Sequence, residues 1–328
     1  VYKRQQERLN NQVANLDVET SENSIQESIA QIYIQILYAA ESVKVNENTL
    51  QVSIAQRDRG QELLNAGSIA KSDFAQLEAQ VSTDRYQLVT AQATLQDYKL
   101  QLKQLLELDG ENEMNIYLPV LSDENVLLPL PAKKDVYMSA LTLRPEIEAS
   151  KINVEASELG IDIAKAGYLP TISLSAGIGT NHTSGSDFTF GEQVKNGWNN
   201  SIGVSVSVPI FNNRQTKSAV QKAKLQRETS LLSLLDEQKT LYKTIEGLWL
   251  DANSAQQRYA AANEKLKSTQ ISYDLISEQF DLGMKNTVEL LTEKNNLLQA
   301  QQEQLQAKYM AILNTQLLKF YQGDKLAL

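Results

Sequence analysis

The chain contains no cysteine, one histidine and only six prolines in 328 residues. Without cysteine, disulfide bonds and thiolate metal sites are excluded. The single histidine, His182, cannot by itself build a histidine metal cluster or supply a Ser-His-Asp triad whose other members are not apparent. No glycine-rich phosphate-binding motif occurs either. We therefore expect no enzyme activity, no cofactor and no metal site.

Long apolar runs and single-sign charge blocks are also absent. No stretch of eighteen apolar residues occurs, so no membrane-spanning helix is predicted. The 31 basic and 40 acidic residues give a net charge of -9 and are interspersed along Gln-, Lys-, Glu-, Ala- and Leu-rich tracts. Such tracts are typical of long helices and coiled coils. Nucleic-acid binding needs a basic patch or stripe, so no nucleic-acid partner is predicted.

The first residues lack the apolar core of a signal peptide, and a helical pattern is already running at Val1. We infer that the sequence is N-terminally truncated and that its first structural element begins upstream.

An internal repeat organises the sequence. A shift of 216 residues, the separation of Gly67 and Gly283, brings residues 66–81 onto residues 282–297 and pairs Asp73 with Glu289. Residues 1–109 are then the remainder of a first structural repeat and residues 136–328 a second repeat. Residues 110–135 hold three of the six prolines and are predicted to be an irregular linker.

A heptad seam runs through the second repeat. Apolar or small residues recur at alternating steps of four and three, which predicts a left-handed coiled coil. They are Leu241, Ile245, Leu248, Ala252, Ala255, Tyr259, Ala262, Leu266, Thr269, Tyr273, Ile276 and Phe280. The equivalent seam of the first repeat starts at Ile25 and becomes polar toward Gly60.

The predicted fold is mainly α, with two long antiparallel coiled-coil hairpins. The second spans residues 213–321 and turns at a tip near 281–289, while the first turns near 65–73. Each tip contains a glycine that can adopt the left-handed conformation of a tight helix ending. A further helix is predicted over residues 136–167.

Two short segments depart from the helical pattern. In "YLPTISLSAGIG" and "SIGVSVSVPIF", apolar residues alternate with serine, threonine and glycine, a period of two that predicts β-strands with one apolar face. The apolar positions are Ile172, Leu174, Ala176, Ile178, Ile202, Val204, Val206 and Val208. Residues 169–211 are therefore predicted to form a β-hairpin.

Lipid is the predicted cover for this apolar face. Transmembrane strands need about 9–11 residues with apolar side chains outward, and Tyr168, Trp198 and Phe211 flank the strands as interfacial aromatics do. Open sheet edges are not tolerated in hydrocarbon, so several protomers must close one barrel together. A hairpin packed on a helix of a soluble protein remains the alternative.

With these residues in place, the chain resembles the TolC-type outer-membrane efflux proteins, the outer membrane factors. The resemblance rests on "GYLPTISLSAGIG", "VSVSVPIFNNRQ", the long helix, the glycine turn and the returning helix. It implies a homotrimer with a pooled twelve-stranded β-barrel in the outer membrane of a Gram-negative-type cell. It also implies an α-helical barrel in the periplasm, with a periplasmic adaptor (membrane fusion) protein, an inner-membrane transporter and outer-membrane lipid as partners.

The same resemblance implies roles for the helix tips. The tips would dock the adaptor through Gly67, Ser68, Ile69, Gly283 and Met284.

Five further residues match the family's periplasmic gate. Glu289 matches an acidic ring at the constriction, Lys285 matches a basic residue facing the position of Ser72, and Asp73 matches the acidic partner of an aromatic at Phe280. Phe280 has no hydroxyl and cannot hydrogen-bond Asp73, a departure from the family pattern. Ordinary solvated charges at helix ends are the alternative for these residues.

The predicted function is passive conduction. The chain would be the outer-membrane channel of a tripartite efflux or type I secretion system; the alternative is a non-channel coiled-coil structural protein or a periplasmic adaptor. An adaptor would carry one hairpin, whereas this sequence predicts two hairpins related by a repeat. The transported substrate is not evident, because a pore lined by small polar residues imposes little chemical recognition.

Overall fold

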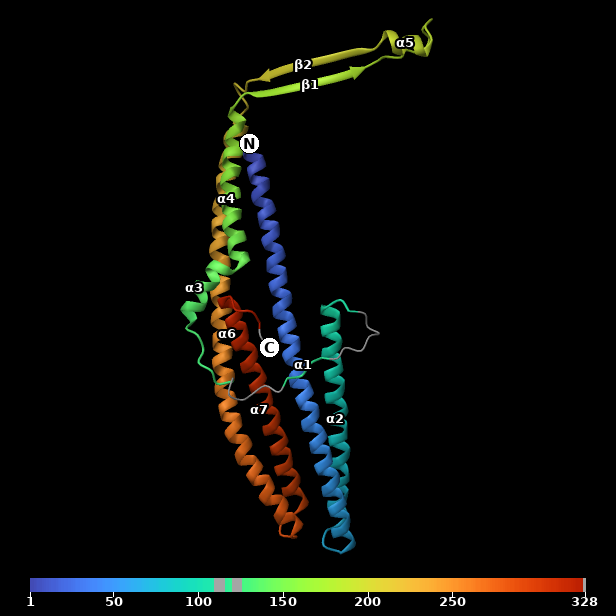
Figure 1. Ribbon diagram of the computed structural model, residues 1–328, viewed down its shortest axis with the longest axis vertical. Helices are drawn as coiled ribbons and strands as arrows, with labels where there is room; N and C mark the ends of the chain where they lie inside the picture. Colours follow the sequence, from blue (N-terminus) through green and yellow to red (C-terminus); the bar gives the residue numbers. More distant parts are fainter. Residues whose placement is uncertain (109–115, 120–125, 327–328) are drawn as a thin grey trace. The chain divides into compact units, whose positions relative to one another are not determined.

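A computed structural model describes residues 1–108, 116–119 and 126–326, and the rest of the predicted linker lies outside the described residues. The fold is mainly α, as predicted (Figure 1). In chain order the elements are α1 (Tyr2–Asn65), α2 (Lys71–Leu105), α3 (Lys133–Leu143), α4 (Pro145–Lys165), the 3-10 helix η2 (Ala166–Tyr168), β1 (Thr171–Gly179), α5 (Phe190–Asn196), β2 (Asn199–Ser207), α6 (Gln215–Asp281) and α7 (Thr287–Gln322).

The chain divides into two compact units. One contains residues 1–16 and 148–237, and the other contains residues 17–147 and 238–328. This division follows packing and differs from the division into two repeats, which remains a prediction. Within the described residues, no helix has both the length and the apolar character needed to cross a bilayer.

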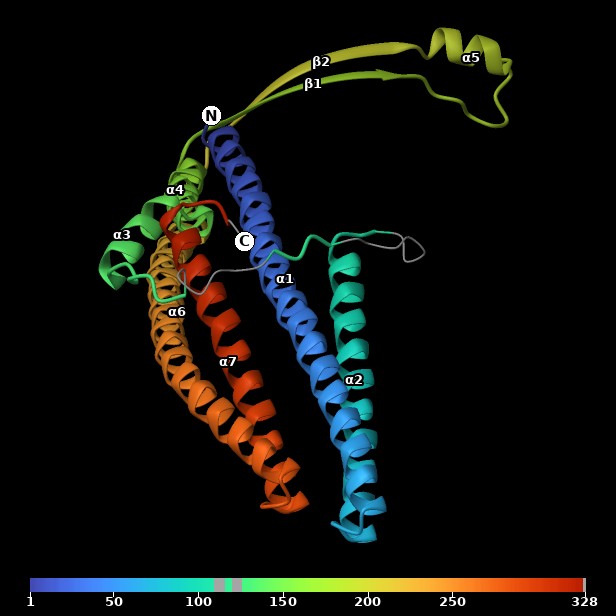
Figure 2. The same ribbon diagram turned by 60° about the horizontal axis from the view of Figure 1, so that its bottom comes forward.

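Two helical hairpins make up most of the second unit. α1 runs antiparallel to α2 and α6 antiparallel to α7, as both ribbon views show (Figures 1 and 2). Gly67 and Gly283 occupy the turns with φ of 71° and 73°. Both turns close in the same way, with Ser68 N donating to Leu63 O and Met284 N to Gln279 O, each at 2.8 Å. The predicted glycine turns are confirmed, and the left-handed φ explains the residue type.

Burial follows the predicted seam of the second repeat. Most of its members are buried between helices, namely Leu241, Ile245, Ala252, Ala255, Tyr259, Ala262 and Phe280. The seam of the first repeat behaves differently, because Ile25 is exposed while polar Asn46 and Ser53 are buried with Ile36 and Leu50. The polar part of that seam is therefore packed, and it packs through polar contacts.

The prediction of a single helix over residues 136–167 was wrong. The structure breaks it into α3 and α4 at Arg144, whose backbone is extended with φ of -77° and ψ of 124°. Pro145 explains the break, since a proline ring clashes with an α-helical conformation of the preceding residue but suits the first position of a new helix. The chain then leaves α4 through η2 and enters β1.

β1 and β2 form an antiparallel pair. Their register places Ile172 opposite Val206, Leu174 opposite Val204 and Ala176 opposite Ile202, so the apolar residues of both strands share one face. Val208 lies one residue beyond the end of β2.

The segment between the strands contains a short helix, α5, which the prediction of a β-hairpin over residues 169–211 did not include. Thr189 and Glu192 form its capping box, with Thr189 N donating to the Glu192 carboxylate at 2.9 Å. That Thr-x-x-Glu spacing was the signal that could have revealed it.

Candidate functional site

The apolar face of the hairpin is open to its surroundings. Ile172 and Leu174 expose 73% and 74% of their surface, and Ile202 and Val204 expose 82% and 68%. Within its own unit, both strands are exposed along their length. Covering one such side chain contributes about 1.5–3 kcal/mol, and an isolated two-stranded hairpin is marginal in water. Among the residues that the structure describes, none covers this face.

The opposite face of the hairpin is small and hydroxylated. Ser173 pairs with Ser205, Ser175 with Gly203 and Gly177 with Ser201. The Ser175 hydroxyl donates to the Gly203 carbonyl oxygen at 3.3 Å. The face carries no charge, and hydroxyls can bond water, so it suits an aqueous environment.

Exposed aromatic residues lie at both ends of the strands. Tyr168 and Phe211 flank the end next to the helices, and Trp198 lies at the loop end. Phe188 and Phe190, next to and within α5, are exposed as well, and the sequence analysis did not single them out. Transmembrane strands carry aromatic residues at both membrane interfaces, so these positions agree with the prediction of membrane strands.

The tip of the α6–α7 hairpin is organised by Glu289. Its amide donates to the Asn286 side chain at 2.9 Å, and its carboxylate accepts from Asn286 N at 3.2 Å, which completes a capping box. Lys285 Nζ lies 2.6 Å from the same carboxylate. Hydrogen bonds from Lys285 and then from the Asn286 backbone lower the pKa of Glu289. Lys285 thus pairs within its own turn, and its predicted place facing Ser72 stays a prediction.

The other predicted gate residues also have local roles. Asp73 accepts a hydrogen bond from Ala70 N at 3.4 Å and caps α2. Phe280 is only 2% exposed and packs in a core with Leu77 and Leu290, which joins α2, α6 and α7. Ser72 is exposed. The structure therefore brings Lys285 and Glu289 together, whereas Asp73 and Phe280 serve different local structures.

The tips present the predicted docking residues at the surface. Gly67, Ser68, Gly283 and Met284 are exposed and Ile69 is partly buried. The two turns are near each other within their unit, since Arg59 at the end of α1 donates to Asp281 O at 3.3 Å. A role of these residues in docking remains a prediction.

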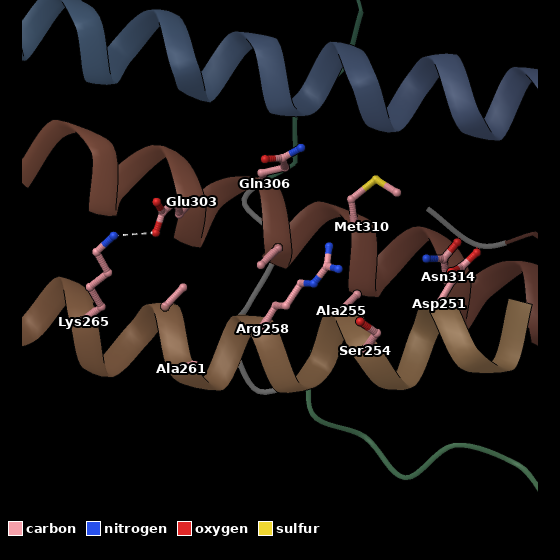
Figure 3. A pocket seen from close by; sticks show the side chains of 12 residues that line it. Asp251, Ser254, Ala255, Arg258, Ala261, Lys265, Glu303, Gln306, Met310 and Asn314 are labelled. Carbon is pink, nitrogen blue, oxygen red and sulfur yellow. Dashed lines mark hydrogen bonds and ion pairs between the residues drawn. The ribbon is translucent and has the colours of Figure 1, made fainter.

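A cavity of about 600 Å³ lies between α6 and α7 (Figure 3). An ion pair of 2.7 Å between Lys265 and Glu303 closes one side, and the Arg258 side chain extends into the space. The lining mixes alanines with charges of both signs. The sequence analysis selected none of these residues. Among the residues that the structure describes, no group of His, Asp and Glu side chains is placed to hold a metal ion.

A comparison with models of known protein families identifies the family of this chain. Residues 136–323, more than half of the chain, match the model of the family described as outer membrane efflux protein. The chain belongs to this family. Membership places it among outer-membrane proteins and confirms the resemblance seen in the sequence.

Individual members of the outer membrane efflux family are distant but match along most of the chain. The outer membrane efflux protein BepC of Brucella suis is 25% identical over 89% of this chain and 61% of its own length. The outer membrane protein TolC of Escherichia coli is 23% identical over 92% of this chain and 62% of its own length. The chain thus spans about three fifths of the length of these relatives.

Solved structures share the fold. CusC superposes with a TM-score of 0.81 at 19% identity, covering 98% of this chain and 73% of CusC. The Campylobacter jejuni CmeC outer membrane channel superposes with a TM-score of 0.78 at 19% identity, covering 99% of this chain and 68% of CmeC. At such identities the likeness concerns the fold alone.

Proposed function

We propose that the protein is the outer-membrane channel of a tripartite efflux or type I secretion system. The observation that carries the proposal is the two-faced hairpin, with exposed Ile, Leu and Val side chains on one side and serine and glycine on the other. Such a ribbon fits a wall between lipid and water. Because open strand edges are excluded from hydrocarbon, copies of the chain must pool their strands. A homotrimer satisfies this requirement, and a twelve-stranded barrel needs four strands from each full-length chain, two more than β1 and β2.

The helical hairpins would continue the conduit through the periplasm. Relatives named for alkaline protease secretion and for pyoverdine export support a role in outward transport. We infer that the tips bind a periplasmic adaptor, which links the channel to an inner-membrane transporter. Gly67, Ser68, Ile69, Gly283 and Met284 are the proposed docking residues, since these turns are accessible on their unit.

The tip would also control ion passage. Glu289 supplies one carboxylate per chain, and three such groups around one axis attract cations and repel anions. Lys285, which pairs with Glu289 at 2.6 Å, reduces this charge. Asp73 and Phe280 would hold the surrounding helix ends in place through a cap and a buried contact, and Ser72, exposed beside Asp73, is a further proposed gate residue.

Conductance of the full-length protein in planar lipid bilayers tests the proposal. A channel requires detergent for extraction, runs as a trimer and produces discrete conductance steps after reconstitution. A coiled-coil structural protein or an adaptor would remain soluble without detergent and leave the bilayer current unchanged, and that result would refute the proposal.

A further inference from the structure

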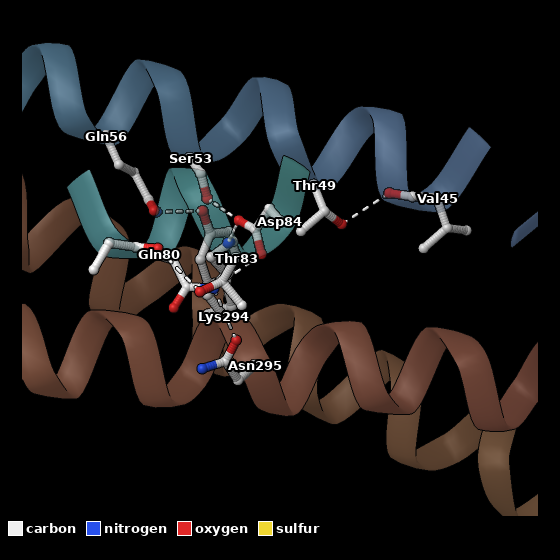
Figure 4. Close-up of polar contacts among 11 residues, drawn as sticks. Val45, Thr49, Ser53, Gln56, Gln80, Thr83, Asp84, Lys294 and Asn295 are labelled. Carbon is white, nitrogen blue, oxygen red and sulfur yellow. Dashed lines mark hydrogen bonds and ion pairs between the residues drawn. The ribbon is translucent and has the colours of Figure 1, made fainter. Parts of the chain in front are cut away.

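A buried ion pair connects the two helical hairpins of the second unit. Asp84 of α2 and Lys294 of α7 are 1% and 3% exposed, and the Lys294 ammonium group contacts the Asp84 carboxylate. The Ser53 hydroxyl of α1 donates to the same carboxylate at 2.5 Å, and Gln80 Nε2 donates to its other oxygen at 2.9 Å (Figure 4). We call Ser53, Asp84 and Lys294 the inter-hairpin latch.

The latch differs from the other buried polar residues of α1. Asn46 and Thr49 are also buried, but each satisfies its own side chain within α1, with hydrogen bonds to Ser42 O at 2.7 Å and Val45 O at 2.8 Å. Ser53 instead crosses to α2. Ser53 and Lys294 therefore join α1 and α7 to the same residue of α2.

Net stability does not account for this arrangement. Removing two charges from water costs several kcal/mol per ion, and well-packed apolar residues are often as stable as a buried pair or more stable. Burial lowers the pKa of Lys294, and the adjacent Asp84 partly opposes that shift. A buried polar contact does specify which residues face each other, as a single buried asparagine does in coiled coils.

The packing next to the latch is incomplete. A cavity of about 80 Å³ is lined by Thr49, Tyr273, Lys294 and Gln301, among other residues of α1, α6 and α7. Apolar Val52, Leu297 and Leu298 also line this space, which leaves α7 room to shift against α1. The Asp84–Lys294 pair limits such a shift, because it can form in one register only.

We propose that the latch sets the axial register of α7 against α1 and α2, and thereby positions the two tips. Lys294 lies five residues after Glu289, about 7–8 Å along the helix. A slip of α7 would carry Glu289 and the α6–α7 turn with it. The proposed register of α7 depends only on the packing of the helices. Its effect on ion passage also depends on the proposed function.

Distances between the tips test the latch. The 328 residues contain no cysteine, so spin labels can be attached through Ser68→Cys and Met284→Cys alone, both at exposed positions. The full-length protein is measured in detergent after dilution with unlabelled chains, so that most trimers contain one labelled chain. Asp84→Leu/Lys294→Met removes both charges and keeps apolar volume.

The expected result is a melting temperature at or above that of the parent and a broadened, shifted distance distribution between the tips. The charge exchange Asp84→Lys/Lys294→Asp should narrow the distribution again. If the apolar pair does not fold, Asp84→Asn/Lys294→Met keeps amide partners for Ser53 and Gln80 and should broaden the distribution likewise. The matched control Glu264→Leu/Lys267→Met removes an exposed ion pair on α6 and should leave the distance distribution between the tips unchanged.

A parental distribution in the uncharged variants would overturn the latch, and so would equal broadening in the control. These outcomes do not depend on conductance. A protein that conducts with unaltered tip distances contradicts the latch alone, whereas a protein with a working latch and no conductance contradicts only the proposed function.

Discussion

The charge at the α6–α7 tip depends on two neighbouring side chains. Glu289→Ala should shift the permeability of the full-length channel away from cations, because one carboxylate per chain is lost from the proposed constriction. Lys285→Ala should act in the opposite direction, since it frees the carboxylate that Lys285 now pairs. Reversal potentials in a salt gradient measure both effects. Glu264→Ala, which removes an exposed carboxylate of α6, is the control. Unchanged selectivity in Glu289→Ala removes this residue from the gate.

The same pair has a predictable pH response. The hydrogen bonds that lower the pKa of Glu289 keep its carboxylate charged below the usual range for glutamate. The stabilisation from this group is therefore complete above the unfolded-state pKa and disappears as the pH falls through the lower folded-state value. Cation selectivity should be lost on acidification at a lower pH in the parent than in Lys285→Ala. Identical midpoints would contradict a pairing of the two side chains in the working channel.

Arg144 is a second residue with a strong expected effect. It is buried at the α3–α4 break, contacts Glu27 at 3.2 Å and Glu146 at 2.8 Å, and lies 4.3 Å from the centre of the Tyr321 ring. Arg144→Met should lower the free energy of unfolding by about 3–5 kcal/mol, because two carboxylates lose their buried partner. Arg227→Met, which breaks an exposed pair with Glu158, should change it by less than about 1 kcal/mol. Denaturant unfolding measures the free energy of unfolding of both variants. Equal losses of free energy would refute a special role of Arg144.

Acidification should partly rescue the Arg144 variant. Burial already raises the pKa of Glu27, although Arg144 opposes the shift. A raised folded-state pKa means that the folded protein binds the proton more readily, so stability from this group increases as the pH falls through that pKa and is complete below the unfolded-state pKa. Without Arg144 the increase should be larger and begin at a higher pH. A stability loss that is independent of pH would contradict the assignment.

At the scale of elements, the hairpins depend on close helix approach. A Cβ built on Gly60 of α1 would lie 2.3 Å from Leu77 Cδ1, and Leu77 is buried. Gly60→Ala should therefore destabilise the protein by about 1–3 kcal/mol through overpacking. Gly247→Ala in α6 meets nothing within 4 Å and should stabilise by about 0.5–1 kcal/mol through helix propensity. Thermal unfolding measures the change in stability of each variant. Changes of the same sign in both variants would contradict the packing described for α1 and α2.

The β-hairpin makes a side-specific prediction. Leu174 and Ser175 are neighbours near the middle of β1 but face opposite sides. Leu174→Arg should destabilise folding into lipid vesicles by about 2–4 kcal/mol, because it places a charge toward hydrocarbon. Ser175→Arg should have a much smaller effect, since we propose that this side faces water. Equal losses would show that the two faces do not differ in environment.

Elements with an uninterrupted period were predictable from the sequence. The seam from Leu241 to Phe280 and the turn glycines gave α6, α7 and their connection, because packing there follows the local pattern. The α3–α4 break was missed although Pro145 signals it, since the apolar period continues across the proline. The latch was missed because Ser53 lies in the polar part of the first seam and Asp84 resembles any other charged residue of a surface helix when each is considered alone. Its meaning depends on residues far apart in the chain.

At the scale of the whole molecule, the hairpin and the family match support each other. The strand register puts apolar and hydroxylated residues on separate faces, and members of the outer membrane efflux family include channels of the same fold. The site residues at the tips were selected by resemblance, and their roles stay predictions. The structure adds that their polar groups are largely bonded within their own turns.

The central claim is that one face of the hairpin contacts lipid and the other contacts water. Spin labels placed one at a time along residues 172–178 and 200–206 of the membrane-embedded protein test it through their accessibility to oxygen and to a water-soluble nickel reagent. We expect a period of two, with oxygen reaching Ile172, Leu174, Val204 and Val206 and nickel reaching the serines between them. Equal access at neighbouring positions, or nickel access at the apolar ones, would contradict it.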